Sequence, residues 1–253
     1  MESTIIPSSE PSRFLAVILA AGQGSRLKEL GKETPKCLLE VGGRPILHHQ
    51  LSALGRAGVR KVAIVIGFRG ELIKEYASRH FPGFNFTFVR NRRFASTNTL
   101  YSLALASRAL AQKTSVLLLN GDVVFDKGIL KRLVESDVLK SYAAAIPGKC
   151  DKEEVKFVVD RNGAITALNK KISPAEAVGE AVGVNKFSPR FWKQLSKNLS
   201  LLQEDFTNEY FEYAVERTIA DGEKLFPFDI GKLNAIEIDF PKDLELARRW
   251  FAA

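Results

Sequence analysis

Short apolar runs alternate along the chain with stretches whose apolar residues recur every three or four positions. An uninterrupted apolar run is typical of a strand buried in a parallel sheet, whereas the second spacing is typical of an amphipathic helix. Strands are predicted at residues 14–21, 62–66, 86–89, 115–119 and 234–239. Helices are predicted at residues 46–57, 71–79, 99–110, 127–136, 189–197, 209–220 and 241–250. This alternation predicts an α/β fold, with a mixed, mainly parallel sheet and helices on both faces.

Residues 142–187 follow a different, β-rich pattern, in which apolar and polar positions alternate. Arg161-Asn162-Gly163 within this segment is a turn sequence. We therefore expect an insertion from about residue 141 to 187 that forms a lobe covering a site on the main sheet. Because no repeat or low-complexity linker interrupts the chain, residues 13–253 are interpreted as a single domain. Residues 1–12, which are rich in Ser and Pro, are interpreted as a flexible leader.

The first predicted strand leads directly into Gly22-Gln23-Gly24-Ser25-Arg26. Glycines after a strand allow a sharp turn and leave backbone N–H groups accessible to an anion, and an arginine fork suits phosphate oxygens. Pro35 and Lys36 follow with a stiff turn and a further cation. The dinucleotide-binding pattern is not met, because Leu27 stands where a third glycine is required, and no Walker sequence is present. The loop therefore predicts a polyphosphate site, with an ordinary strand-to-helix turn as the alternative.

Two aspartates stand at the ends of predicted strands, Asp122 after Gly121 and Asp239 at the end of Ala-Ile-Glu-Ile-Asp. Open α/β sheets bind ligands at the carboxyl ends of their strands. Mg²⁺ favours a few carboxylates together with substrate phosphates. Both aspartates are therefore candidate Mg²⁺ ligands, and the alternative for each is a helix cap.

The strings LAAGQGSRL and PKCLLEVGGRPIL together resemble the nucleotidyltransferase family, the enzymes that make nucleotide-activated sugars and alcohols. The resemblance implies a Rossmann-like nucleotidyltransferase fold and a Mg²⁺-dependent transfer from an NTP with release of pyrophosphate. It also implies catalytic roles for Arg26 and Lys36, and metal ligation by Asp122 and Asp239. The nucleotide-binding residues that it implies are Leu19, Ala20, Ala21, Gly22, Gly24, Ser25, Asn98, Thr99, Ser102 and Asp122.

The segment Thr-Asn-Thr-Leu-Tyr-Ser at 97–102 stands where many sugar nucleotidyltransferases carry Gly-Thr-Ala. It resembles instead the branch that activates phosphocholine or 2-aminoethylphosphonate with CTP. Transfer of CMP from CTP to a small amino-alcohol phosphate or phosphonate is therefore implied. Asn98 and Thr99 suit recognition of a base or ribose, and helix capping is the alternative for Asn98. A sugar-1-phosphate nucleotidyltransferase and a non-catalytic nucleotide-binding module are the alternative functions.

The same resemblance implies acceptor-binding residues in the second half of the chain. Lys156 and Lys170 stand where the family has lysines that reach the acceptor phosphate, and a solvated position is the alternative for each. Glu180 stands in a segment that closes the acceptor pocket. Glu212 follows Tyr210 in an aromatic segment, and a carboxylate beside aromatic rings can hold an ammonium group. The alternative is an aromatic core stripe with Glu212 facing outward.

Composition excludes several other classes of function. The formal net charge of the 253-residue chain is +8, but Lys and Arg are spread along it, which suits anionic small substrates better than nucleic acid. No apolar run approaches the roughly 20 residues that span a membrane. The two cysteines, Cys37 and Cys150, lack metal-site spacing. We expect a cytoplasmic protein with reduced thiols and no nucleic-acid or membrane partner, and the sequence leaves its oligomeric state open.

Overall fold

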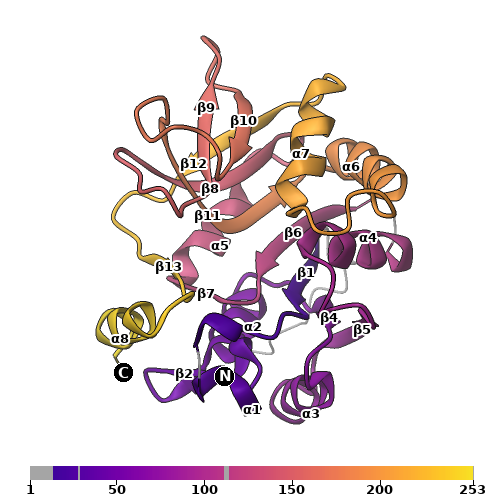
Figure 1. The fold of residues 1–253 in the computed structure, drawn as a ribbon, viewed down its shortest axis with the longest axis vertical. Helices are drawn as coiled ribbons and strands as arrows, with labels where there is room; N and C mark the ends of the chain where they lie inside the picture. Colours follow the sequence, from indigo (N-terminus) through magenta and orange to yellow (C-terminus); the bar gives the residue numbers. More distant parts are fainter. Residues whose placement is uncertain (1–13, 28, 111–113, 253) are drawn as a thin grey trace, which may run out of the picture.

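A mixed sheet of nine strands runs through the molecule (Figure 1). The computed structural model describes residues 14–27, 29–110 and 114–252, and the predicted leader at residues 1–12 lies outside them. The main path of the sheet has the order β10-β9-β11-β6-β1-β4-β5, with β8 paired to β11 and β12 paired to β8. The strands are β1 (Phe14–Ala20), β4 (Lys61–Ile66), β5 (Asn85–Arg90), β6 (Ser115–Asn120), β8 (Ser141–Pro147), β9 (Lys156–Val159), β10 (Ile165–Asn169), β11 (Gly179–Phe187) and β12 (Leu225–Asp229).

The strands β6, β1, β4 and β5 form the parallel half of the sheet. β1 lies between β4 and β6, and its side chains alternate between two cores. Ala16 and Ile18 pack into one core, and Val17 and Leu19 pack into the other. Because both faces of β1 are covered, neither face carries polar residues, and this explains the uninterrupted apolar run in the sequence.

Helices cover the two faces of the sheet, as the sequence predicts. α2 (Ile46–Arg56), α3 (Gly70–His80) and α5 (Lys127–Glu135) contribute to the core on one face. α4 (Thr99–Ala109), α6 (Pro189–Leu202) and α7 (Phe211–Ala220) contribute to the core on the other. A third, smaller cluster joins α8 (Pro241–Trp250) to β2 (Glu40–Val41) and to β7 (Val123–Phe125). Among the described residues, no helix is both long and apolar enough to cross a lipid bilayer.

The β-rich segment at 141–187 is part of the central sheet at both of its ends. β8 and β11 pair with each other in antiparallel fashion, and β11 also pairs with β6. Only the chain between β8 and β11 extends further, as the β9–β10 hairpin seen at the top of Figure 1. The expectations that residues 13–253 form a single domain and that this segment covers a site stay predictions.

The observed elements differ from the predicted ones mainly at their ends and in the short strands. α6 continues to Leu202, beyond the predicted end at residue 197, and α7 begins at Phe211 rather than at residue 209. β12 is absent from the prediction, and its sequence contains Pro227, a residue that is unfavourable in a central strand. Among the described strands β12 pairs with β8 alone, and an edge strand tolerates proline. The remaining short elements are η1 (Ser25–Leu27), α1 (Glu29–Glu33), η2 (Lys36–Leu38), β3 (Arg44–Pro45) and β13 (Ala235–Glu237).

Candidate active site

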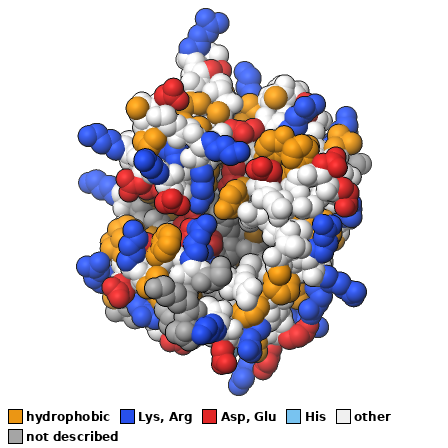
Figure 2. Space-filling view, in the orientation of Figure 1, with side chains coloured by type: hydrophobic (Ala, Val, Ile, Leu, Met, Phe, Trp, Pro, Cys, Tyr) orange, Lys and Arg blue, Asp and Glu red, His pale blue; other side chains and the backbone are white. Residues whose placement is uncertain are grey.

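A cavity of about 250 Å³ opens at the carboxyl ends of β1 and β6. Its walls come from the glycine loop, the first turns of α4 and α7, the turn after β6, and the end of β13. Figure 2 shows this face of the molecule hollowed near its centre, with acidic and basic side chains beside the hollow. The position agrees with the rule that open α/β sheets bind ligands at the carboxyl ends of their strands.

Three carboxylates meet in the cavity because two short strands pair beyond the end of the main sheet. β13 runs antiparallel to β7 with Glu237 opposite Val123, and the Ile238 N–H donates to the Asp122 carbonyl oxygen at 3.0 Å. This pairing brings Glu237 and Asp239 to Asp122, and one carboxylate oxygen of each lies within 4.8 Å of the others. Hard oxygen donors at this spacing fit a divalent cation such as Mg²⁺.

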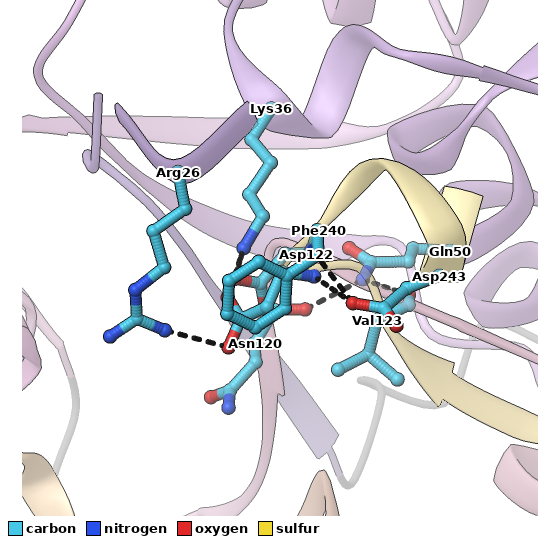
Figure 3. Close-up of polar contacts among 9 residues, drawn as sticks. Arg26, Lys36, Gln50, Asn120, Asp122, Val123, Phe240 and Asp243 are labelled. Atoms are coloured by element: carbon cyan, nitrogen blue, oxygen red, sulfur yellow. Dashed lines mark hydrogen bonds and ion pairs between the residues drawn. The ribbon is translucent and has the colours of Figure 1, made fainter. Parts of the chain in front are cut away.

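Lys36 and Arg26 both point toward the aspartates (Figure 3). Lys36 Nζ donates to Asp122 Oδ2 at 2.7 Å and to Asp239 Oδ1 at 2.8 Å, and Arg26 Nη1 donates to Asp239 Oδ2 at 2.9 Å. Burial raises the pKa of Asp239, but the charges of Lys36 and Arg26 outweigh burial and lower it overall. Burial lowers the pKa of Lys36, but the two aspartates outweigh it and raise that pKa overall. These shifts keep Lys36 and Asp239 charged at neutral pH. Neither aspartate caps a helix, since β7 follows Asp122 and the N-cap of α8 is Phe240.

Glu237 is the carboxylate of this cluster that was not predicted from the sequence. Burial, followed by the charges of Asp122 and Asp239, raises its pKa. The signal for it was present in the sequence, because residues two apart on a strand share one face, and Glu237 stands two positions before Asp239. An acidic residue at that position of the strand predicts a second carboxylate beside Asp239.

The glycine loop also lines the cavity. Gly22 and Gly24 face it, and Gly24 has a φ of 65°, which favours glycine. Gly121 lies at the turn after β6, where a Cβ atom would lie 2.5 Å from the Leu19 carbonyl oxygen. Only glycine therefore allows the turn that carries Asp122 to approach β1 this closely.

The structure places the other predicted nucleotide-binding residues of this stretch differently. Leu19 and Ala20 line the cavity, together with the glycines. Ala21 does not line it; its carbonyl oxygen accepts a hydrogen bond from the Phe68 N–H at 3.1 Å. Ser25 begins η1, and its side chain lies outside the part of the chain that the structure describes.

At the start of α4 the predicted polar residues hold the backbone in place. Asn98 is the N-cap of the helix, and its Oδ1 accepts from the Thr99 N–H at 2.8 Å, so the capping alternative is observed. Thr99 Oγ1 accepts from the Phe211 N–H at 2.9 Å, which ties α4 to the start of α7. Both residues line the cavity, whereas Ser102 is buried and accepts a hydrogen bond from Asn91. Nucleotide recognition by these side chains stays a prediction.

The structure does not bring Lys156 and Glu180 to the cavity wall. Lys156 is fully buried, and its Nζ donates to the carbonyl oxygens of Asp151, Lys152 and Glu154. The lysine therefore supports the loop at 151–154, and neither the predicted acceptor contact nor a solvated position is observed. Burial, together with the nearby acidic residues Glu154 and Asp151, raises the pKa of Glu180.

Lys170, Tyr210 and Glu212 do line the cavity. The Lys170 ammonium lies over the Tyr210 ring, 5.6 Å from its centre. Glu212 is 7% exposed, its Oε2 has no hydrogen-bond partner among the described residues, and burial raises its pKa to about 7. The outward-facing alternative for Glu212 is therefore wrong, because the residue is buried in the wall.

Residues 16–183 match the sequence profile of the MobA-like NTP transferase domain, which covers the glycine loop, Lys36 and the turn at Asp122. This chain belongs to the MobA-like NTP transferase family. The predicted nucleotidyltransferase resemblance is thereby confirmed.

Relatives of this NTP transferase include proteins that act with cytidine nucleotides, according to their names. The chain is 34% identical to CMP-5'-(3-aminopropyl)phosphonate synthase of Streptomyces rubellomurinus, over 94% of this chain and 38% of that protein. It is 26% identical to CTP:phosphoglutamine cytidylyltransferase of Campylobacter jejuni, over 91% of this chain and 98% of that protein. The chain therefore spans well under half the length of the first relative and nearly all of the second.

The solved structure of CTP:phosphocholine cytidylyltransferase from Streptococcus pneumoniae shares the fold of this NTP transferase. It superposes with a TM-score of 0.79 at 22% identity, and the match covers 94% of this chain and 99% of that one. The inositol-1-phosphate CTP transferase of T. maritima superposes with a TM-score of 0.76 at 21% identity. These matches confirm the predicted Rossmann-like nucleotidyltransferase fold.

Proposed function

We propose that this chain is a cytidylyltransferase that transfers CMP from CTP to a small phosphate or phosphonate acceptor and releases pyrophosphate. The observation that carries the proposal is the cavity itself, in which a glycine loop, Lys36 and three carboxylates lie together at the strand ends. The choice of CTP is supported by the two relatives whose names combine a cytidine nucleotide with a phosphorus-containing partner.

The proposed reaction needs no general base. An acceptor oxygen bonds to the α-phosphorus of CTP, and the bond from that phosphorus to the oxygen leading to the β-phosphorus breaks. A phosphate monoester has its second pKa near 6, so it is largely dianionic at pH 7. Cys37 on the cavity wall is no nucleophile, because burial, followed by the nearby Asp122, raises its pKa to about 12. Catalysis therefore consists of orientation and charge neutralisation.

The residues of the cavity divide into a nucleotide side and a metal side. The backbone N–H groups of Gly22 and Gly24, with Arg26, hold the β- and γ-phosphates of CTP. Lys36 neutralises the charge that builds up at the α-phosphate. Its ammonium leaves the aspartates to do so, since it now lies between them.

Asp122, Glu237 and Asp239 are proposed to hold Mg²⁺. With these three residues as its ligands, a bound Mg²⁺ would supply positive charge to offset the negative charge of the phosphate oxygens. The geometry supports this ligand set, because hard oxygen donors converge from the end of β6 and from β13. In the described structure, Lys36 and Arg26 form ion pairs with Asp122 and Asp239.

The acceptor is proposed to carry an amine or quaternary ammonium group beside its phosphate or phosphonate. Glu212 supports this, because a buried carboxylate with a free oxygen gains most from a cationic ligand. Tyr210 offers an aromatic ring next to it, although Lys170 already lies over that ring. Ion pairing with Glu212 is therefore the main source of selectivity, and cation–π attraction is secondary.

The test is pyrophosphate release from CTP, UTP, GTP and ATP, each with a panel of acceptors. The panel contains phosphocholine, 2-aminoethylphosphonate, 3-aminopropylphosphonate and two hexose-1-phosphates, and every reaction is repeated with EDTA in place of Mg²⁺. Fastest release with CTP and an amine-bearing acceptor is expected. Faster release with a hexose-1-phosphate would instead identify a sugar nucleotidyltransferase, and release from none of the NTPs would contradict a catalytic role.

A further inference from the structure

Gln50 is a buried polar residue on the otherwise apolar inner face of α2. Its side chain is 0% exposed, and the buried residues around it on the helix include Leu47, Leu51 and Leu54. Removing a carboxamide from water is unfavourable unless hydrogen bonds replace those to water. A leucine at this position would avoid that penalty, so the contacts of Gln50 indicate what it does.

Both contacts of the Gln50 side chain are to the turn that carries Asp122 (Figure 3). Nε2 donates to the carbonyl oxygen of Asn120, the last residue of β6, at 2.8 Å. It also donates to the carbonyl oxygen of Val123, the first residue of β7, at 2.8 Å. These two carbonyl groups bracket Gly121 and Asp122. Two acceptors facing one nitrogen also identify it as the NH₂ group rather than the oxygen.

The rest of the turn is tied to its surroundings by single backbone hydrogen bonds. The Gly121 N–H donates to the Leu19 carbonyl oxygen at 3.0 Å, and the Asp122 carbonyl oxygen accepts from the Ile238 N–H at 3.0 Å. Gln50 supplies the only side-chain hydrogen bonds to the turn's backbone among the described contacts, and it supplies two of them. It therefore links α2 to both ends of the segment that aims the Asp122 carboxylate.

We infer that Gln50 is a positioning residue for Asp122. Its two hydrogen bonds hold the β6–β7 turn so that the Asp122 carboxylate meets those of Glu237 and Asp239. The inference rests on the proposed function, in that it takes these carboxylates as the metal ligands. Partners that orient a metal ligand contribute about 10- to 100-fold to metal affinity in other sites, even though they never touch the ion.

A matched control separates positioning from general support of the fold. Gln203 is also a buried glutamine, at 3% exposed, and its Nε2 donates to the Ser200 carbonyl oxygen at 3.1 Å. It stands at the end of α6 and does not line the cavity. Gln50→Met and Gln203→Met therefore both replace a buried carboxamide, but only the first releases the Asp122 turn.

The experiment measures Mn²⁺ binding to the full chain by electron paramagnetic resonance, with and without CTP, and melting temperature in parallel. Both variants are expected to melt below wild type. Gln50→Met is expected to bind Mn²⁺ at least about tenfold more weakly than wild type, and Gln203→Met within about threefold of it. Equal Mn²⁺ affinities in the two variants would overturn the inference, as would a wild-type chain that binds no Mn²⁺ in either condition.

A second variant covers the case in which Gln50→Met does not fold. In Gln50→Glu a protonated carboxyl group can still donate to one of the two carbonyl oxygens. Its Mn²⁺ affinity is expected between those of wild type and the fully released turn, and wild-type affinity would overturn the role of the paired hydrogen bonds. Turnover is assayed separately: a wild-type chain that binds Mn²⁺ but transfers no CMP would contradict the proposed function and leave this comparison valid.

Discussion

Lys36 neutralises different groups before and during the proposed reaction. In the described structure its ammonium pairs with Asp122 and Asp239, and in the proposed complex it faces the α-phosphate. An arginine at this position would be bulkier, and a neutral residue would leave the two aspartates facing each other without a cation. Lys36 is therefore expected to contribute both to the rate of transfer and to the stability of the fold. Its place in the sequence predicts only the effect on the rate.

Lys36→Ala is expected to lower turnover by roughly 10²- to 10³-fold, because one preorganised cation is removed from the developing charge. The chain should also melt at a lower temperature, and added Mg²⁺ should restore part of that loss by replacing the missing charge. Pyrophosphate release and thermal melting measure the two effects. Lys127→Ala, at an exposed lysine on α5, is the control. Turnover of Lys36→Ala within threefold of wild type, about 0.6 kcal/mol, would rule out the catalytic role.

Substitution of a carboxylate in the cluster is expected to change the Mg²⁺ dependence of turnover, whereas substitution of an exposed acidic residue is not. Asp122→Asn and Glu237→Gln keep the shape of each side chain but remove the charge that a hard cation requires. Asp122→Asn should abolish Mg²⁺-dependent turnover, and Glu237→Gln should raise the Mg²⁺ concentration for half-maximal rate. Glu245→Gln, at an exposed residue of α8, should leave the Mg²⁺ dependence unchanged. An unchanged dependence in Glu237→Gln would remove this residue from the ligand set.

At the scale of elements, the start of α8 determines where Asp239 points. Asp243 Oδ2 accepts from the backbone N–H groups of Asp239 at 3.0 Å and of Phe240 at 2.7 Å. The same carboxylate therefore caps the helix and holds the backbone of a proposed metal ligand. The start of α8 therefore affects the cavity through Asp239.

Asp243→Ala is expected to destabilise the chain by about 1 kcal/mol, the usual effect of losing a capping side chain. It should also raise the Mg²⁺ requirement, because Asp239 loses its backbone anchor. Asp243→Asn keeps an oxygen acceptor, so it should lower the stability less and raise the Mg²⁺ requirement less than Asp243→Ala does. Chemical denaturation and Mg²⁺ titration of the rate provide the two measurements. A loss of stability without any shift in Mg²⁺ dependence would show that Asp243 acts on the helix alone.

The long elements were predictable because their patterns are strong and local. β1, β4 and β6 are continuous apolar runs, and α5 and α8 have a clear helical periodicity of apolar residues. The short strand β7 was not predicted, because its three residues become a strand only by pairing with β13, whereas the strand predicted at 234–239 covers β13. Glu237 was missed although it lies in that predicted strand, because only the strand-end residues Asp122 and Asp239 were considered as ligands.

Acceptor-side residues were harder to predict, because alternation in a strand does not reveal what lies on each face. Lys156 stands in such a strand, and only the fold of the loop at 151–154 shows that its ammonium is used there. Gln50 was not recognised either, since a single polar residue on an apolar helix face says nothing about its partners. In both cases the hydrogen-bond partners are set by the tertiary structure, which the local sequence pattern does not show.

At the scale of the whole molecule, the two halves of the sheet supply different sides of the cavity. The parallel half contributes the ends of β1 and β6, and with them the glycine loop and Asp122. The antiparallel half contributes Lys170 after β10, and α7 contributes Glu212. Thr99 joins α4 to the start of α7, so a direct hydrogen bond links the proposed nucleotide side to the proposed acceptor side.

This division predicts that Glu212 affects the affinity for the acceptor and the pH dependence of stability. It should not affect the affinity for CTP. Burial raises its pKa from 4.5 to about 7, so the folded chain binds a proton more tightly than the unfolded chain does. The stability that this proton contributes is complete below about pH 4.5 and is lost as the pH rises through about 7. Glu212→Gln should remove this fall, and denaturation at pH 5 and pH 8 measures it.

The same titration should set the affinity for an amine-bearing acceptor, with the opposite sign. Charged Glu212 attracts an ammonium group and the protonated form does not, so the KM for 2-aminoethylphosphonate should fall as the pH rises from 6 to 8, by up to about tenfold. Glu212→Gln assayed with the same acceptor is the control, because the titration of the phosphonate is then shared and cancels in the comparison. Glu212→Gln should abolish the part of the pH dependence that belongs to the protein and leave the KM for CTP unchanged. An equal pH dependence of the KM for 2-aminoethylphosphonate in wild type and Glu212→Gln would contradict amine recognition by Glu212 and would favour an acceptor without a cationic group, such as a hexose-1-phosphate, in this cavity.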